Sequence, residues 1–118
     1  MDKAPAGQPL ILRIQAEIAS VPRGQTCSYG VIATRAGAPG RARLVGKVLR
    51  EAPAELGLPW HRIVRADGRL AFPPESEAWR EQCRRLRNEG VELRQGRVAE
   101  RYRVRAEDID ALLWRPSR

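Results

Sequence analysis

The stretch Arg41-Ala-Arg-Leu-Val-Gly-Lys-Val-Leu-Arg-Glu51 has the clearest two-faced pattern in the chain. At about 100° per residue, Arg43, Lys47 and Arg50 fall within one narrow sector of a helix. The apolar residues at positions 44, 45, 48 and 49 fall on the other side. Gly46 lies at the edge of the basic stripe, where a missing side chain lets the backbone approach a bulky partner. The pattern predicts an amphipathic helix with a basic outer face.

A shorter helix is predicted immediately before this one, over residues 28–36. Ser28 is suited to the N-cap position, and Gly37 can adopt the left-handed conformation that ends a helix. Two short helices joined by a Gly-containing turn are typical of a helix-turn-helix. The spacing alone fits equally well a solvated amphipathic helix whose charges only keep it in water.

The flanking sequence predicts two further helices within the core, one that begins at Pro9 and stops by Ser20 and one over residues 75–88. Trp79 and Cys83 should face the core in the second of these, which should end at Gly90. Two hairpins are predicted, each with turn residues between its strands. The first joins strands at 61–65 and 69–72, and the second, wing-like hairpin joins strands at 91–93 and 97–98. A short helix is predicted over residues 106–114. We expect one small α+β domain over residues 1–118, with a winged-helix-like core and a flexible lead at residues 1–8.

Composition favours a nucleic-acid partner. The 118 residues include 22 Lys and Arg against 14 Asp and Glu, a net charge of +8. Residues 41–70 hold seven of the basic residues and three of the acidic ones, so half of the excess lies there. Two cysteines and one histidine do not form a zinc-ligand pattern, so we expect no metal and no cofactor. With no long apolar run and no leader pattern, we expect a cytoplasmic protein that does not enter membranes.

Three stretches together resemble the DNA-binding domain of the O6-alkylguanine-DNA alkyltransferases: Ser28-Tyr29-Gly30, Arg41-Ala42-Arg43-Leu44-Val45-Gly46 and Pro59-Trp60-His61-Arg62-Ile63-Val64. The likeness covers residues 9–93. The repair enzymes of that family carry Pro-Cys-His-Arg, whose cysteine accepts the alkyl group. Pro-Trp-His-Arg is the signature of the alkyltransferase-like proteins, so Trp60 stands where the nucleophile would be. An indole has no comparable nucleophilic atom, but its apolar face can pack against an extruded base.

The resemblance implies roles for single residues. Tyr29 matches a tyrosine that crowds the 3′ phosphate and helps to rotate the nucleotide outward, and Arg43 matches an arginine that fills the gap left by the flipped base. The family places its recognition helix in the minor groove, which would suit the small residues Ala42 and Gly46, with Lys47 contacting phosphate. Further residues expected at the DNA or in the lesion pocket are Ser28, Pro59, His61 and Arg62.

The implied function is non-enzymatic recognition of O6-alkylguanine in double-stranded DNA. The protein would flip the base and mark the site for nucleotide excision repair, as a nucleoid-associated monomer. Three expected departures from the repair enzymes fit binding better than catalysis: we expect no N-terminal domain, Ala52-Pro53 replaces an Asn-Pro pair, and we expect no glutamate that would bond to His61. Two alternatives remain open, an active alkyltransferase that uses Cys27 or Cys83 and a winged-helix regulator that reads a specific operator.

Overall fold

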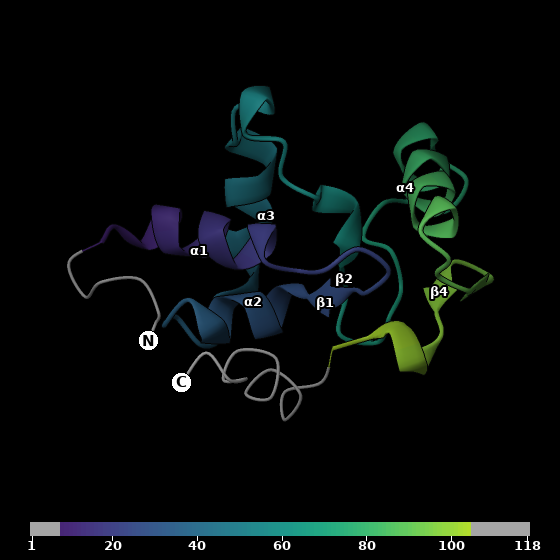
Figure 1. Ribbon diagram of the computed structural model, residues 1–118, viewed down its shortest axis with the longest axis horizontal. Helices are drawn as coiled ribbons and strands as arrows, with labels where there is room; N and C mark the ends of the chain where they lie inside the picture. Colours follow the sequence, from purple (N-terminus) through teal and green to yellow (C-terminus); the bar gives the residue numbers. More distant parts are fainter. Residues whose placement is uncertain (1–7, 105–118) are drawn as a thin grey trace.

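A computed structural model describes residues 8–104, so the predicted helix at 106–114 and nearly all of the predicted lead lie outside the described residues. The helices are α1 (Leu10–Ala19), α2 (Tyr29–Arg35), α3 (Ala42–Glu51) and α4 (Glu77–Asn88). The strands are β1 (Cys27–Ser28), β2 (Ile63–Val64), β3 (Leu93–Arg94) and β4 (Arg97–Val98). Short 3-10 turns cover Ala54–Leu56, Trp60–Arg62 and Glu100–Tyr102. Figure 1 shows α1, α2 and α3 in one half and α4 with β4 in the other, with β1 and β2 between them. The expected α+β class is confirmed.

The predicted helix-turn-helix is confirmed as α2 and α3. The hydroxyl of Ser28 accepts a hydrogen bond from the backbone N–H of Val31 at 3.1 Å, which caps the first turn of α2. Gly37 follows that helix with a φ of +91°, a conformation that costs glycine little. Val45 and Val48 of α3 are buried against α1 and α2, so the apolar stripe of α3 faces the core.

The first predicted hairpin is wrong. Residues 63 and 64 pair in parallel with β1, with Cys27 opposite Ile63 and Ser28 opposite Val64. Both residues of β2 are buried, Ile63 in the core of the first half and Val64 in the core of the second. A strand that is covered on both faces has a continuous apolar sequence, without the alternation of a half-exposed hairpin strand. The turn residues beside such a strand do not show which other strand it pairs with. Of the predicted hairpin, only the tight turn is present. A hydrogen bond from the N–H of Arg65 to the carbonyl of Arg69 closes this turn.

The second, wing-like hairpin is confirmed. Leu93 pairs with Val98 in an antiparallel ladder, and the two turn residues Gln95 and Gly96 both have positive φ, as a type I′ turn requires. The hairpin packs on α4: a Cβ at Gly96 would lie 2.8 Å from the ring of Trp79. Trp79 packs against the second core and Cys83 is buried in it, as predicted.

One carboxylate joins the two halves. Glu89, which follows α4, accepts hydrogen bonds from His61 Nε2 at 2.8 Å, from Arg62 Nη2 at 2.8 Å and from the backbone N–H of Gly24 at 3.0 Å. Arg62 also donates to the carbonyl of Val21 at 2.9 Å. The expectation that His61 has no glutamate partner is therefore wrong. Because this carboxylate is ionised and can only accept, Nε2 of the imidazole is the donor in this hydrogen bond.

Replacing Glu89 should destabilise the fold strongly. The Glu89 side chain is 5% exposed, and Glu89→Gln leaves the Arg62 charge without its counter-ion in a buried place. We expect a loss of about 3 kcal/mol in the free energy of unfolding, measured with urea. Glu75→Gln, which removes a carboxylate from an ion pair exposed on both sides, should cost less than about 1 kcal/mol. Equal losses in the two variants would contradict this account.

The contribution of Glu89 should depend on pH. Burial alone raises the pKa of this carboxyl, but the hydrogen bonds from Arg62, His61 and Gly24 outweigh burial and lower the pKa from 4.5 to about 2. A lowered folded-state pKa gives stability that is complete above the ordinary pKa and is lost as the pH falls through the folded one. The stability difference between the wild type and Glu89→Gln should be constant near neutrality and shrink between about pH 5 and pH 2. Urea unfolding at several pH values measures it, and a difference that is the same at every pH would refute the assignment.

Candidate nucleic-acid interface and base pocket

The outer side of α3 forms a basic surface. Arg43, Lys47 and Arg50 are exposed there, while Val45 and Val48 of the same helix are buried. A shallow groove of about 780 Å³ runs over this surface. We call it the basic groove, and its lining residues are Gly40, Arg41, Ala42, Arg43, Leu44, Lys47 and Arg50. Because this lining holds four cationic side chains and no carboxylate, the groove suits a polyanion such as a phosphate backbone.

A second cavity, of about 690 Å³, adjoins the groove and shares Ala42, Arg43 and Arg50 with it. We call it the aromatic cavity, and its lining residues are Tyr29, Ala42, Arg43, Gly46, Leu49, Arg50, Trp60, Arg65, Ala71 and Phe72. The rings of Trp60 and Phe72 meet edge to face, with centroids 6.0 Å apart and an interplanar angle of 84°. The volume lies within the range of about 300–1,000 Å³ found for small-molecule pockets. An apolar hollow with aromatic walls therefore opens beside a cationic groove.

The aromatic cavity brings together five of the residues singled out in the sequence: Tyr29, Ala42, Arg43, Gly46 and Trp60. Three elements supply them, namely the start of α2, the outer side of α3 and the 3-10 turn before β2. At Gly46, the nearest atom that a Cβ would meet is Arg50 Nη1 at 3.5 Å, so this part of the helix surface is open.

The other predicted site residues lie elsewhere. Ser28 caps α2, and Lys47 lines only the basic groove. The remaining three, Pro59, His61 and Arg62, line a neighbouring cavity of about 670 Å³, to which Trp60 also contributes. Since His61 and Arg62 bond to Glu89, their role in the structure is to hold the turn that carries Trp60.

Three residues at the site were not identified from the sequence. Phe72 was expected at the end of a hairpin strand, but it contacts Trp60 instead. Arg65 follows β2 and lines the aromatic cavity. The guanidinium of Arg85 lies 5.4 Å from the centre of the Trp60 ring while its Nε pairs with Glu81 Oε2 at 2.7 Å. Phe72 is the only phenylalanine of the chain, which was the one available signal.

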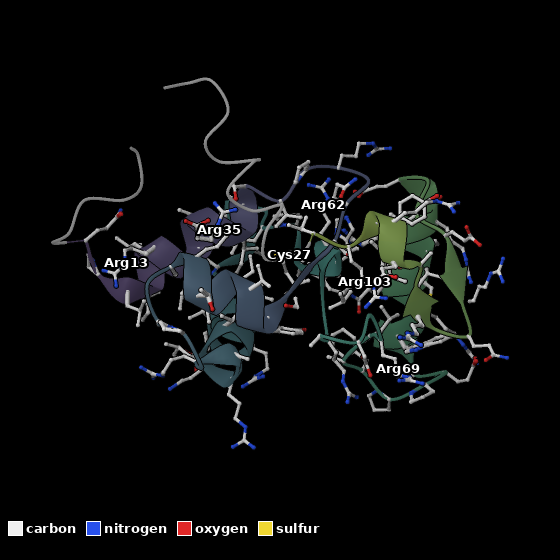
Figure 2. The ribbon with its side chains drawn as sticks, turned by 90° about the horizontal axis from the view of Figure 1, so that it is seen from below. Arg13, Cys27, Arg35, Arg62, Arg69 and Arg103 are labelled. Atoms are coloured by element: carbon white, nitrogen blue, oxygen red, sulfur yellow. The ribbon has the colours of Figure 1, made fainter. Side chains whose placement is uncertain are left out.

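The protonation states at the site favour binding over nucleophilic chemistry. Burial raises the pKa of Tyr29, against the opposing effect of Arg50, so its hydroxyl remains a hydrogen-bond donor. Burial raises the pKa of Cys27 to about 12 and also raises that of Cys83. Both thiols are buried and neither lines the aromatic cavity; Figure 2 shows Cys27 near the middle of the molecule. A reactive thiolate is therefore missing from the described lining of the cavity.

Between residues 8 and 104, no group of three His, Cys, Asp or Glu side chains has an arrangement that could hold a metal ion. In the same part of the chain, none of the helices has the length and apolar character needed to cross a membrane.

Comparison with known proteins agrees with this geometry. The family profile described as "6-O-methylguanine DNA methyltransferase, DNA binding domain" matches residues 9–91. Alkyltransferase-like protein 1 of Schizosaccharomyces pombe is 31% identical over 99 residues, covering 84% of this chain and 88% of that protein. A DNA base-flipping protein of Vibrio parahaemolyticus is 36% identical over 90 residues, covering 75% of this chain and 88% of that protein.

Solved structures give the same result. The structure of S. pombe Atl1 in complex with damaged DNA containing O6-carboxymethylguanine superposes with a TM-score of 0.70 at 27% identity, covering 81% of this chain and 94% of that one. The O6-methylguanine methyltransferase of Mycobacterium tuberculosis gives 0.58 at 31% identity; the match covers 70% of this chain but only 49% of that enzyme. The chain therefore belongs to the family of the 6-O-methylguanine DNA methyltransferase DNA-binding domain and, within it, to the alkyltransferase-like proteins.

Proposed function

We propose that this protein recognises O6-alkylguanine in double-stranded DNA by flipping the damaged base into the aromatic cavity, without transferring the alkyl group. The observation that carries the proposal is the position of Trp60. Its indole lines a cavity that also holds Tyr29 and Arg43 and that adjoins the basic groove of α3. The similarity to an alkyltransferase-like protein and to a DNA base-flipping protein supports this function.

In this mechanism the basic groove binds the DNA backbone and α3 enters the minor groove. Arg43 lines both the groove and the cavity, which supports the role we propose for it, to fill the space left by a base that leaves the stack. The small residues Ala42 and Gly46 allow the strand to approach α3 closely. Extrusion costs a few kcal/mol, less for a weakly paired base, and phosphate contacts with Arg and Lys offset this cost. Discrimination between damaged and normal guanine follows from that difference.

The extruded purine would pack on aromatic walls. Trp60 and Phe72 supply faces and edges on one side of the cavity, and base stacking on such rings is worth about 1–3 kcal/mol per base. Tyr29, whose hydroxyl remains protonated, would donate to the 3′ phosphate and assist the rotation. The pocket reads the modified base and not the neighbouring sequence, so binding should tolerate most sequence contexts.

The fate of the marked site is also a proposal. A protein that binds a lesion without removing it can promote repair only by recruiting repair proteins. We infer that this protein marks the lesion for the proteins of nucleotide excision repair. We further infer that it does so as a monomer, in the cytoplasm on the nucleoid. The net charge of +8 supports a protein that is mostly bound to nucleic acid.

Arg43→Ala and Tyr29→Ala should lower the preference for a lesion. Matched duplexes with and without one O6-methylguanine are titrated at two salt concentrations, so that charge-driven attachment, which weakens with salt on both duplexes, is separated from recognition. The wild type should bind the duplex with the lesion more tightly than the undamaged duplex at both salt concentrations. Each variant should reduce the ratio of the two affinities on the order of tenfold, the size of one charge-assisted or stacking contact.

Arg87→Ala is the matched control, because Arg87 is exposed on α4 and lines none of the three cavities described above. It should lower overall affinity slightly and leave the ratio unchanged. Circular dichroism confirms that each variant is folded. A lesion ratio near one in the wild type, or an unchanged ratio in both site variants, would overturn the proposed function.

The protein should not acquire an alkyl group. After incubation with an O6-methylguanine duplex, intact mass spectrometry should show an unchanged mass, because both thiols are buried and hold their protons. A true alkyltransferase run in parallel provides the positive control. A shift of one methyl group on Cys27 or Cys83 would show that the protein is an enzyme.

A further inference from the structure

The lining of the aromatic cavity is mostly apolar, but all of its charged side chains are cationic. Three arginines line it, Arg43, Arg50 and Arg65, and none of its lining residues is a carboxylate. A guanine with a small neutral O6 substituent has no negative charge that could pair with them. The charge of the cavity therefore exceeds what stacking and flipping require.

Arg65 differs from the other two arginines. Arg43 and Arg50 also line the basic groove, where phosphates account for their charge, whereas Arg65 lines the aromatic cavity alone among the three cavities described. Its side chain is exposed, and no hydrogen bond or salt bridge joins it to another part of residues 8–104, although its charge is one of the smaller causes that lower the pKa of Asp67, after the hydrogen bonds from Arg69. The carboxylate of Asp67, two positions on, is already bound by the backbone N–H and the Nη1 of Arg69, at 3.0 and 2.9 Å. The guanidinium of Arg65 is thus available to a ligand in the cavity.

An unpaired guanidinium beside aromatic walls distinguishes ligands by charge. A carboxylate on the O6 substituent can accept charge-assisted hydrogen bonds, which are about twice as strong as neutral ones. Arginine presents its donors in a planar fork that matches a carboxylate. A neutral adduct of the same shape would leave the arginine without a partner.

We propose that Arg65 makes the aromatic cavity prefer O6-alkyl adducts that end in a carboxylate, such as O6-carboxymethylguanine, over neutral adducts of the same shape. This inference rests on the proposed function, because it requires the flipped base to occupy the cavity. The adduct would reach Arg65 from a purine packed on the aromatic wall that Trp60 and Phe72 form, since both rings line the same cavity as Arg65.

The test compares two adducts that differ only in charge. Three duplexes of one sequence carry O6-carboxymethylguanine, its neutral carboxamide analogue O6-carbamoylmethylguanine, or guanine, and fluorescence anisotropy gives the three affinities. The wild type should bind the carboxylate about tenfold more tightly than the amide, the gain expected when a charged acceptor replaces a neutral one. In Arg65→Gln this ratio should fall to near one. Both duplexes present the same phosphates, so a general loss of DNA affinity does not change the ratio.

Arg87→Gln is the matched control, since it removes one exposed charge outside the cavity and should keep the tenfold ratio. A ratio near one in the wild type, with both adducts still bound more tightly than guanine, would overturn this inference and leave the proposed function standing. Equal affinity for all three duplexes would instead refute the proposed function. A tenfold ratio that survives in Arg65→Gln, as expected if Arg65 only binds a phosphate, or one that disappears in Arg87→Gln, would also overturn the assignment to Arg65.

Discussion

The buried carboxylate of Glu89 is the contact on which the site depends. It binds the two side chains that follow Trp60 in the sequence, His61 and Arg62, and the backbone of Gly24 in the opposite half. The turn that carries Trp60 is therefore fixed from α4 on one side and from the loop before β1 on the other. Breaking such a network leaves a buried charge unpaired, which costs several kcal/mol, so this turn is held far more firmly than an ordinary loop.

The same network has a chemical meaning. A carboxylate that orients an imidazole is the arrangement that activates a nucleophile in many hydrolases and transferases. Here the residue before the imidazole is an indole, and the two thiols of the chain lie buried elsewhere. On our proposal the network retains its positioning role without a group to activate. It sets an apolar ring at the wall of a cavity where a repair enzyme of this family would hold its cysteine.

Local signals in the sequence predicted the helix-turn-helix and the wing, whereas the role of Trp60 came from the family resemblance and stays a prediction. Ser28, Gly37 and the two-faced stripe of α3 are read from neighbours in the chain, and the structure places each as expected. The errors concern long-range partners. Ile63 and Val64 pair with β1 because two cores cover them, and Glu89 reaches His61 across 28 residues, which no local pattern records. Arg65 and Phe72 line the cavity for the same reason, because the segment after β2 is bonded to the second half through Gly68 and Leu70 and shares the cavity with residues of α2 and α3.

The central claim is that an everted purine occupies the cavity walled by Trp60. A crystal structure of the protein bound to a duplex with one O6-methylguanine tests it most directly. The account predicts the modified purine outside the helix, in contact with the indole, with the side chain of Arg43 in the space that the base has left. A modified purine still stacked between its neighbours, with the indole far from any base, would contradict it.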